Sequence, residues 1–331
     1  MFSKKKYPYL IAEVGNSHEG SFNLCKKSIK EAKIAGADCV KFQLFDYKTI
    51  VNPRLKIIKH AKSKHKFQSD RFKSIQLDIK KVKILSNIAK KIGIDFSVSV
   101  FDPILVKPVA KYISFFKIAS GDITYVDLLK EIKKTGKKVV LSTGMSSVKE
   151  IKDAVRILGK NKCEILHCIS KYPTENNELN LNSITYLKRL FKKDIGFSDH
   201  SKGIDACVVA SALGSKVIEK HFIPSGAKKI AADKALSINY EDFLLMKNRI
   251  QETIDMLGLK TKKLFSYEKY YLKNLRRSVY FSKPIKKGSL IKKKDLIIVR
   301  PHNYSGLSIS QINKIVGKKA KRNFKKFSLV K

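Results

Sequence analysis

Residue patterns that mark several common protein classes are scarce in this chain of 331 residues. The five cysteines are odd in number and form no CxxC pair, which argues against a disulfide framework and a structural zinc site. The 16 glycines and 8 prolines are too few for a fibrous or low-complexity chain. No stretch approaches ~18 uninterrupted apolar residues, and the N-terminus lacks the apolar core of a signal peptide. We therefore expect a cytoplasmic protein with reduced thiols and no membrane partner.

Acidic residues are also scarce, because 28 of them face 70 lysines and arginines and leave a formal charge of +42. A pI near 10 is a common sign of nucleic-acid binding. Yet only nine of the basic residues are arginine, which leads in bidentate recognition of phosphates and bases. The lysines are spread along the whole chain and form no single patch. We therefore expect no nucleic-acid partner, and a basic polyanion-binding protein remains the non-enzyme alternative.

Short apolar, β-branched runs alternate with amphipathic segments through most of the chain. Helical spacing is clear at Asn23–Ala35, Ser74–Ile92, Ser147–Leu158 and Ile204–Leu213. The eight strand-like runs are Tyr9–Val14, Cys39–Phe45, Ile94–Val100, Phe115–Ala119, Lys138–Ser142, Cys163–Ile169, Ile195–Asp199 and Lys216–His221. Eight β-α units over ~250 residues is the arithmetic of a TIM (β/α)8 barrel, and a doubly wound open sheet is the competing α/β fold. The eight-fold count favours the barrel.

The periodicity changes near the end of the predicted barrel and divides the chain into domains. We expect a barrel over 1–258, a lysine- and tyrosine-rich linker over 259–274, and a small β-rich domain over 275–331. Within the barrel, residues 45–72 are too long for a simple βα loop. This insertion predicts a flap near the mouth of the barrel.

Polar side chains interrupt the apolar strands near the ends that form the active site of a TIM barrel. Glu13 ends the first strand, Lys41 and Gln43 share one face of the second, and Lys117 lies in the fourth. The fifth runs into the small polar turn Ser142–Gly144, whose backbone N–H groups can hold a phosphate or carboxylate. Each lysine could instead be an ion-pair partner inside the barrel, with Glu13 neutralising one of them.

Two histidines end the last two predicted strands. Ser198 shares a face with His200, and Glu219 shares a face with His221. A lone histidine at a strand end is more often structural, but this paired placement favours a metal site. Two imidazoles with carboxylate, water or substrate oxygens suit Mn²⁺, Zn²⁺, Fe²⁺ or Co²⁺.

At this point the sequence resembles the sialic acid synthases, which include N-acetylneuraminate synthase and its legionaminic and pseudaminic relatives. The segments that carry the resemblance are IAEVGNSHEG, GADCVKFQLF, FKIASGD, VVLSTGM, LHCISKYPT, GFSDHSKG and GSKVIEKHF, in this order. The tail from Arg276 is similar to the antifreeze-like (SAF) domain that follows the barrel in this family.

The resemblance implies a transferase reaction. Phosphoenolpyruvate (PEP) would condense with an open-chain N-acyl amino sugar, such as N-acetylmannosamine, and water to give N-acetylneuraminate or a close relative plus phosphate. The alternative is a legionaminic or pseudaminic acid synthase that uses a diacetamido-dideoxy hexose.

The resemblance also implies roles for single residues. Glu13 matches the acid/base carboxylate, and His200 with His221 would hold a divalent metal, Mn²⁺ foremost, with Mg²⁺ or Co²⁺ as alternatives. The positions that match PEP-binding residues are Lys41, Lys117, Ser120, Ser142 and Ser198. Those that match sugar-binding or supporting residues are Gln43, Asp122, Tyr172, Asp233 and Arg300. Arg300 would reach over from a partner subunit, which implies a domain-swapped homodimer.

The sequence departs from the family pattern at a few positions. Ser17 stands where the family usually has asparagine, with Asn16 one place earlier, while Asp122 and Ser170 replace the more usual Glu and Asn. The glycine-rich stretch after the SAF arginine reads His302–Gly306. These departures touch the sugar side or supporting positions, so the resemblance leaves the sugar open.

Overall fold

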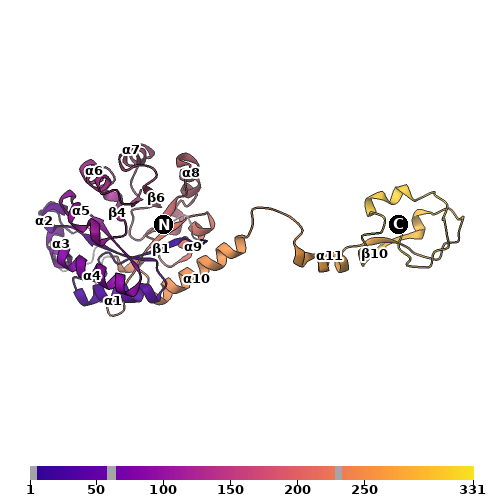
Figure 1. Ribbon diagram of the computed structural model, residues 1–331, viewed down its shortest axis with the longest axis horizontal. Coiled ribbons are helices and arrows are strands. Elements are labelled where there is room, and N and C mark those ends of the chain that lie inside the picture. The colour runs from indigo at the N-terminus through magenta and orange to yellow at the C-terminus, as the bar shows by residue number, and fades with distance from the viewer. Residues whose placement is uncertain (1–5, 58–64, 228–232) are drawn as a thin grey trace. The chain divides into compact units, whose positions relative to one another are not determined.

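A computed structural model describes residues 6–57, 65–227 and 233–331 of the chain. Residues 58–64 of the predicted flap therefore lie outside the described residues. The chain divides into two compact units, Met1–Gly258 and Leu259–Lys331, and each is described by itself (Figure 1). In the part that the structure describes, no helix is long and apolar enough to cross a membrane.

The first unit is a closed barrel of eight parallel strands that pair in chain order (Figure 1). The strands are β1 (Tyr9–Glu13), β2 (Cys39–Leu44), β3 (Asp95–Val100), β4 (Phe116–Ile118), β5 (Val139–Ser142), β6 (Cys163–Cys168), β7 (Gly196–Asp199) and β8 (Val217–His221). Pairing of β1 with β8 closes the barrel. The predicted TIM barrel is confirmed, and the open doubly wound sheet is excluded.

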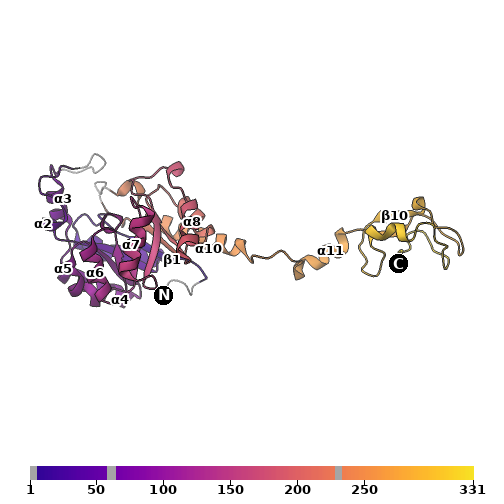
Figure 2. The ribbon, with the colours of Figure 1, turned by 90° about the horizontal axis from the view of Figure 1, so that it is seen from above.

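Helices cover the outside of the barrel (Figure 1). They are α1 (Phe22–Ile34), α4 (Ile79–Ile92), α5 (Pro103–Val109), α6 (Val126–Lys134), α7 (Val148–Leu158), α8 (Asn182–Phe191), α9 (Asp205–Ala212) and α10 (Tyr240–Leu257). The long segment after β2 forms two further helices, α2 (Tyr47–Ile50) and α3 (Gln68–Ile75), which contact each other (Figure 2).

The single helix predicted over Ser74–Ile92 is wrong, because the chain breaks between α3 and α4. Gln76 has an extended backbone, and its side-chain oxygen accepts a hydrogen bond from the backbone N–H of Tyr47 at 2.8 Å. Asp78 then caps α4 by accepting the N–H of Lys81 at 2.7 Å. Such a cap satisfies one of the free N–H groups of the first turn, so a new helix begins there.

The barrel interior is apolar in its lower layers and polar above them. Alternation along a strand places Tyr9, Ile11 and Glu13 on one face of β1, and the two apolar members lie deepest. The apolar layer consists of Tyr9, Ile11, Cys39, Phe115, Val140, Leu166 and Val217. A larger apolar core lies between the strands and the helices. Polar side chains at the carboxyl ends of the strands therefore stand on a closed apolar floor.

The second unit has a small core of its own. It contains α11 (Lys269–Leu275) and the antiparallel pair β9 (Ser278–Phe281) and β10 (Leu296–Val299). Buried apolar side chains gather around this pair, namely Val279, Phe281, Ile285, Ile291, Ala320 and Val330. The predicted β-rich tail is confirmed, while part of the expected linker forms α11.

Gly196 occupies a position of β7 where the barrel leaves no room for a side chain. A Cβ at this position would lie 2.6 Å from the backbone oxygen of Val217 and against the side chain of Leu166. We predict that Gly196→Ala lowers the free energy of unfolding by about 1–3 kcal/mol, as overpacking of a core does. Thermal denaturation measures the loss. Gly121→Ala is the control, since nothing lies within 4 Å of a Cβ there. An unchanged Tm for the Gly196 variant would contradict this packing.

Candidate active site

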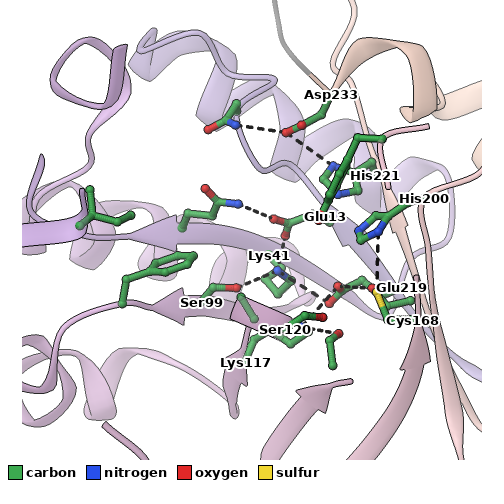
Figure 3. Close-up of a pocket in the computed structure, with 18 of the residues that line it drawn as sticks. Glu13, Lys41, Ser99, Lys117, Ser120, Cys168, His200, Glu219, His221 and Asp233 are labelled. Carbon is green, nitrogen blue, oxygen red and sulfur yellow. Dashed lines mark hydrogen bonds and ion pairs between the residues drawn. The ribbon is translucent and has the colours of Figure 1, made fainter. Parts of the chain in front are cut away.

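A pocket of about 270 Å³ lies at the carboxyl ends of the barrel strands (Figure 3). It gathers most of the side chains predicted from the sequence: Glu13, Lys41, Gln43, Lys117, Ser120, Ser142, Tyr172, Ser198, His200, His221 and Asp233. These residues come from β1, β2, β4, β5, β7 and β8 and from the loops that follow the strands. The barrel thus brings together residues that are up to some two hundred positions apart in the sequence.

Two lysines and two carboxylates form a buried charge cluster at the floor of the pocket (Figure 3). Lys41 Nζ lies 2.5 Å from Glu13 Oε2 and 3.7 Å from Glu219 Oε2. Lys117 Nζ lies 3.7 Å from the other oxygen of Glu219. Glu13 therefore pairs with Lys41, as the ion-pair interpretation expected, and Glu219 lies between both lysines.

The two carboxylates of this cluster have opposite protonation tendencies. Burial raises the pKa of Glu13 above its usual range, although Lys41 opposes this effect. Burial also disfavours the charged form of Glu219, but Lys117 and Lys41 outweigh it and hold its pKa at about 2. Glu219 is thus a fixed anion, whereas Glu13 is the carboxyl group that can carry a proton. Environments that push the pKa values of two neighbouring carboxyl groups apart in this way indicate which group exchanges protons, here Glu13, and which stays charged, here Glu219.

Serine hydroxyls surround the two ammonium groups. Lys41 Nζ donates to Ser99 Oγ at 2.9 Å, and Lys117 Nζ donates to Ser142 Oγ at 2.7 Å. Ser120 Oγ accepts the backbone N–H of Gly144 at 3.0 Å. A Cβ at Gly144 would meet the hydroxyl groups of Ser120 and Ser170, so only glycine lets the backbone approach this closely. Ammonium and hydroxyl donors together suit the oxygens of a small anion.

His200 and His221 lie side by side at the ends of β7 and β8, with their ring centroids 5.4 Å apart. The Nδ1 atom of His200 lies 2.7 Å from the carbonyl oxygen of Ile169. Because a carbonyl can only accept, Nδ1 carries the hydrogen and Nε2 remains for a ligand. The Nδ1 atom of His221 is buried without a hydrogen-bond partner and lies 3.9 Å from Asp233 Oδ2.

These two imidazoles fit a divalent metal with open coordination positions. Burial and the neighbouring His200 and Lys41 lower the pKa of His221 well below its usual value, so the ring stays neutral, as a metal ligand must be. Among the described residues, no group of three or more His, Cys, Asp or Glu side chains could hold a metal ion.

Amide, carboxylate and aromatic side chains line the rest of the pocket, together with Arg71 near Asp233. Asn16 Nδ2 donates to Asp233 Oδ2 at 3.2 Å, and Gln43 Nε2 donates to Glu13 Oε1 at 3.4 Å. The ring of Tyr172 lies 4.2 Å from that of His200. Asn16 thus lines the pocket, whereas Ser17, its neighbour in the chain, does not.

Two of the predicted site residues do not line this pocket. Asp122 lies in a short 3-10 helix, Ser120–Asp122, next to the lining residue Ser120. Arg300 belongs to the second unit, where it is exposed and its Nε donates to the carbonyl oxygen of Leu275 at 2.7 Å.

The structure also adds lining residues that were not predicted. Ser99 is the last residue but one of β3, and the alternation of Ser97 and Ser99 with valines was the available signal. Cys168 ends β6 with its Sγ 3.7 Å from His200 Nδ1. Arg71 and Phe72 come from α3, inside the predicted flap, where no periodic pattern marks them.

A closed parallel barrel with a polar, largely buried pocket at its carboxyl-terminal mouth is the arrangement of a TIM-barrel enzyme. The chain belongs to the NeuB family, whose model matches residues 28–262, and a SAF domain matches residues 276–328.

Similarity to individual proteins extends over nearly the whole chain. The N,N'-diacetyllegionaminic acid synthase of Campylobacter jejuni is 35% identical and aligns with 98% of this chain and 99% of its own length. The human N-acetylneuraminate-9-phosphate synthase is 30% identical, over 94% of this chain and 88% of its own. A crystal structure of the N-acetylneuraminic acid synthetase of Leptospira borgpetersenii, in complex with citrate, superposes with a TM-score of 0.72 at 29% identity, covering 81% and 91% of the two chains.

The Asp122 carboxyl is half-buried, and burial raises its pKa to about 6 although Lys117 opposes the effect. The folded protein therefore binds a proton more tightly here than the unfolded chain, and its stability falls as the pH rises from about 4 to about 6. We predict that Asp122→Asn has a higher Tm than the wild type at pH 7.5, and that the gap closes as the pH is lowered through this window. Thermal denaturation at several pH values measures it. Asp127→Asn, at an exposed position of α6, should show no such gain; a gap at Asp122 that grew toward pH 4 would contradict the assignment.

Proposed function

We propose that this protein condenses PEP with an N-acyl amino sugar and water to give a nonulosonic acid and phosphate. The observation that carries the proposal is the pair of buried lysines with their serine hydroxyls, which lie in the same pocket as two adjacent histidines. PEP is a small anion with a phosphate and a carboxylate, and it needs two such clusters of donors. The related synthases named above support the reaction class.

The charge cluster accounts for how PEP would be held. Lys117 with Ser120 and Ser142 would bind one anionic group, while Lys41 with Ser99 would bind the other. Glu219 offsets part of the charge of both ammonium groups, because it lies 3.7 Å from each of them. Both lysines can then attract PEP, and PEP need not displace a tightly paired carboxylate from Lys117.

The proposed reaction proceeds in three bond changes. C3 of PEP attacks the aldehyde carbon of the open-chain sugar, and the aldehyde oxygen takes up a proton. Water adds at C2 and gives up one proton, which balances the proton taken up by the aldehyde oxygen. The C–O bond to phosphate then breaks, the C2 hydroxyl loses its proton to the departing phosphate, and a C2 ketone remains. Glu13 is suited to hold and return the proton, because its pKa is raised and Gln43 and Lys41 fix both of its oxygens.

His200 and His221 would hold a divalent metal, Mn²⁺ foremost, with Mg²⁺ or Co²⁺ as alternatives. When bound, such a metal supplies Lewis-acid polarisation of the aldehyde oxygen and orients the reactants. The cost of leaving His221 Nδ1 buried without a hydrogen bond supports a ligand at this point.

The sugar would lie against Asp233, Asn16, Gln43 and Tyr172. Arg71 and Phe72 of α3 would close the same side, together with Ile50 and Phe101. Arg300 would complete the site from a partner subunit in a domain-swapped homodimer. The five buried free cysteines fit a reducing cytoplasm.

Phosphate release from PEP tests the reaction itself. Purified protein with Mn²⁺ should release phosphate from PEP only when an N-acyl amino sugar is present, and EDTA should abolish the release. A panel of N-acetylmannosamine, its 6-phosphate and diacetamido-dideoxy hexoses, with mass detection of the product, distinguishes the neuraminic, legionaminic and pseudaminic outcomes. Failure of every sugar to support release with Mn²⁺, Mg²⁺ or Co²⁺ would exclude the assignment.

Arg71 allows a separate test of the sugar side of the pocket. Its guanidinium lines the pocket and faces the Asp233 side, and its Nη1 is held by Gln68 Oε1 at 3.3 Å. We expect Arg71→Gln to raise KM for the sugar about tenfold or more, because a hydrogen bond from a charged group contributes about 1.5–3 kcal/mol. KM for PEP should change little. Steady-state kinetics with each substrate varied separately measures both values.

The matched control for this variant is Arg54→Gln, since Arg54 is exposed and does not line the pocket. An equal rise in both KM values for the Arg71 variant would show that Arg71 acts on the whole pocket and not on the sugar side.

A further inference from the structure

A second charge pair lies outside the pocket, between the barrel and α9. Lys220 Nζ lies 2.7 Å from Asp199 Oδ2, and both side chains are completely buried. Cys207 of α9 donates its thiol to the same oxygen of Asp199 at 3.3 Å, which places the pair on the helix-facing side of the sheet. Asp199 and Lys220 are direct register partners across β7 and β8.

This pair is adjacent in sequence to both candidate metal ligands. Asp199 precedes His200 and Lys220 precedes His221, so alternation turns the charge pair outward and the two imidazoles inward. On the inner side, Ser198 Oγ donates to Glu219 Oε1 at 3.0 Å, between the preceding residues of the same two strands. The ends of β7 and β8 are therefore joined on both faces.

The pair also holds the backbone beyond the end of β7. The strand ends at Asp199, so the sheet ladder does not fix His200. Asp199 Oδ1 accepts the N–H of Ser201 at 2.8 Å, and Lys220 Nζ donates to the carbonyl oxygen of Ser201 at 2.6 Å. The carbonyl of His200 accepts the N–H of Thr174 at 3.0 Å. His200 thus lies in a segment whose backbone is held by this ion pair on one side and by the parallel bridge between Thr174 and Ser201 on the other.

Stability alone gives a weak reason for such a pair. Desolvation of two charges costs several kcal/mol each, and apolar residues of similar volume are often equal or better for stability. A buried pair of this kind is best attested where it fixes one arrangement among several. The arrangement fixed here is the separation and orientation of the two histidines.

We propose that the Asp199–Lys220 pair is a positioning device for the metal site, because it sets the geometry of His200 relative to His221. The proposal rests on the proposed function of these two histidines. Neither Asp199 nor Lys220 lines the pocket, so both act through the imidazoles and not on the substrate.

The experiment measures Mn²⁺ binding to the metal-free, full-length protein by titration calorimetry, without substrates. The principal variant is the double substitution Asp199→Leu with Lys220→Met, which removes both charges together and leaves neither buried alone. The milder variant Asp199→Asn keeps an acceptor for the Ser201 N–H. The control is Glu164→Gln with Lys193→Met, an ion pair of 3.4 Å that includes the start of β6, at the opposite end of the barrel.

We expect the double variant to bind Mn²⁺ about 10- to 100-fold more weakly than the wild type, as loss of a group that orients a metal ligand does. Its Tm without metal should fall only modestly, because apolar packing offsets the lost charge pair while the N–H and carbonyl of buried Ser201 lose their partners. Excess Mn²⁺ should restore phosphate release, with KM for PEP unchanged. Asp199→Asn should give a smaller loss in affinity, and the control pair none.

Two results would overturn the proposal in different ways. If the wild type binds Mn²⁺ but the double variant and Asp199→Asn bind it equally well, the ion pair has no positioning role. If the wild type itself binds no Mn²⁺, and His200→Ala behaves identically, the metal site of the proposed function fails, and this inference fails with it.

Discussion

Two lysine ammonium groups lie buried inside the barrel, and the rest of the site depends on how their charge is balanced. A buried ammonium is stable only when paired and hydrogen-bonded, and Glu219 lies between Lys41 and Lys117 while Glu13 pairs with Lys41. The four residues come from four strands, and only a closed barrel makes β8 a neighbour of β1 and so completes the cluster. Closure of the barrel and the balance of charge around the two lysines are thus linked, because the β1–β8 pairing places both carboxylates beside the ammonium groups.

The strands and the pocket floor were predictable because both rest on local patterns. Apolar runs of the right length gave eight strands, and polar residues at alternating positions marked Lys41, Lys117 and the two histidines. The break between α3 and α4 was missed, because the apolar period continues through Gln76 and a single Asp78 cap ends it. The periodicity alone predicts one continuous helix, and the Asp78 cap alone is too weak a signal to divide it. The break becomes clear only once Gln76 is known to bind the distant backbone N–H of Tyr47.

The residues missed in the site share one property: their role depends on a partner distant in sequence. Glu219 reads as one polar residue beside His221, and its function is visible only once both lysines lie within 3.7 Å. Arg71 sits in a lysine-rich segment, where one more cation carries no signal. The same holds for the formal charge of +42, since the few cations in the pocket matter through placement and not through number. Apart from Lys41 and Lys117, no lysine among the described residues lines the pocket.

The ends of β7 and β8 show how one strand period serves two purposes. Because successive side chains alternate between faces, Ser198 with Glu219 and His200 with His221 point inward, while Asp199 and Lys220 point toward α9. Three consecutive residues at each strand end thus place pocket side chains on the inner face and the ion pair on the outer face. A shift of β7 by one residue would turn its side chains to the opposite faces and bury the His200 imidazole against α9, while His221 stayed inside the barrel. Asp199 and Lys220 can pair only in the correct register of β7 and β8. The two residues that we propose to orient the histidines therefore also favour the strand pairing that forms the site.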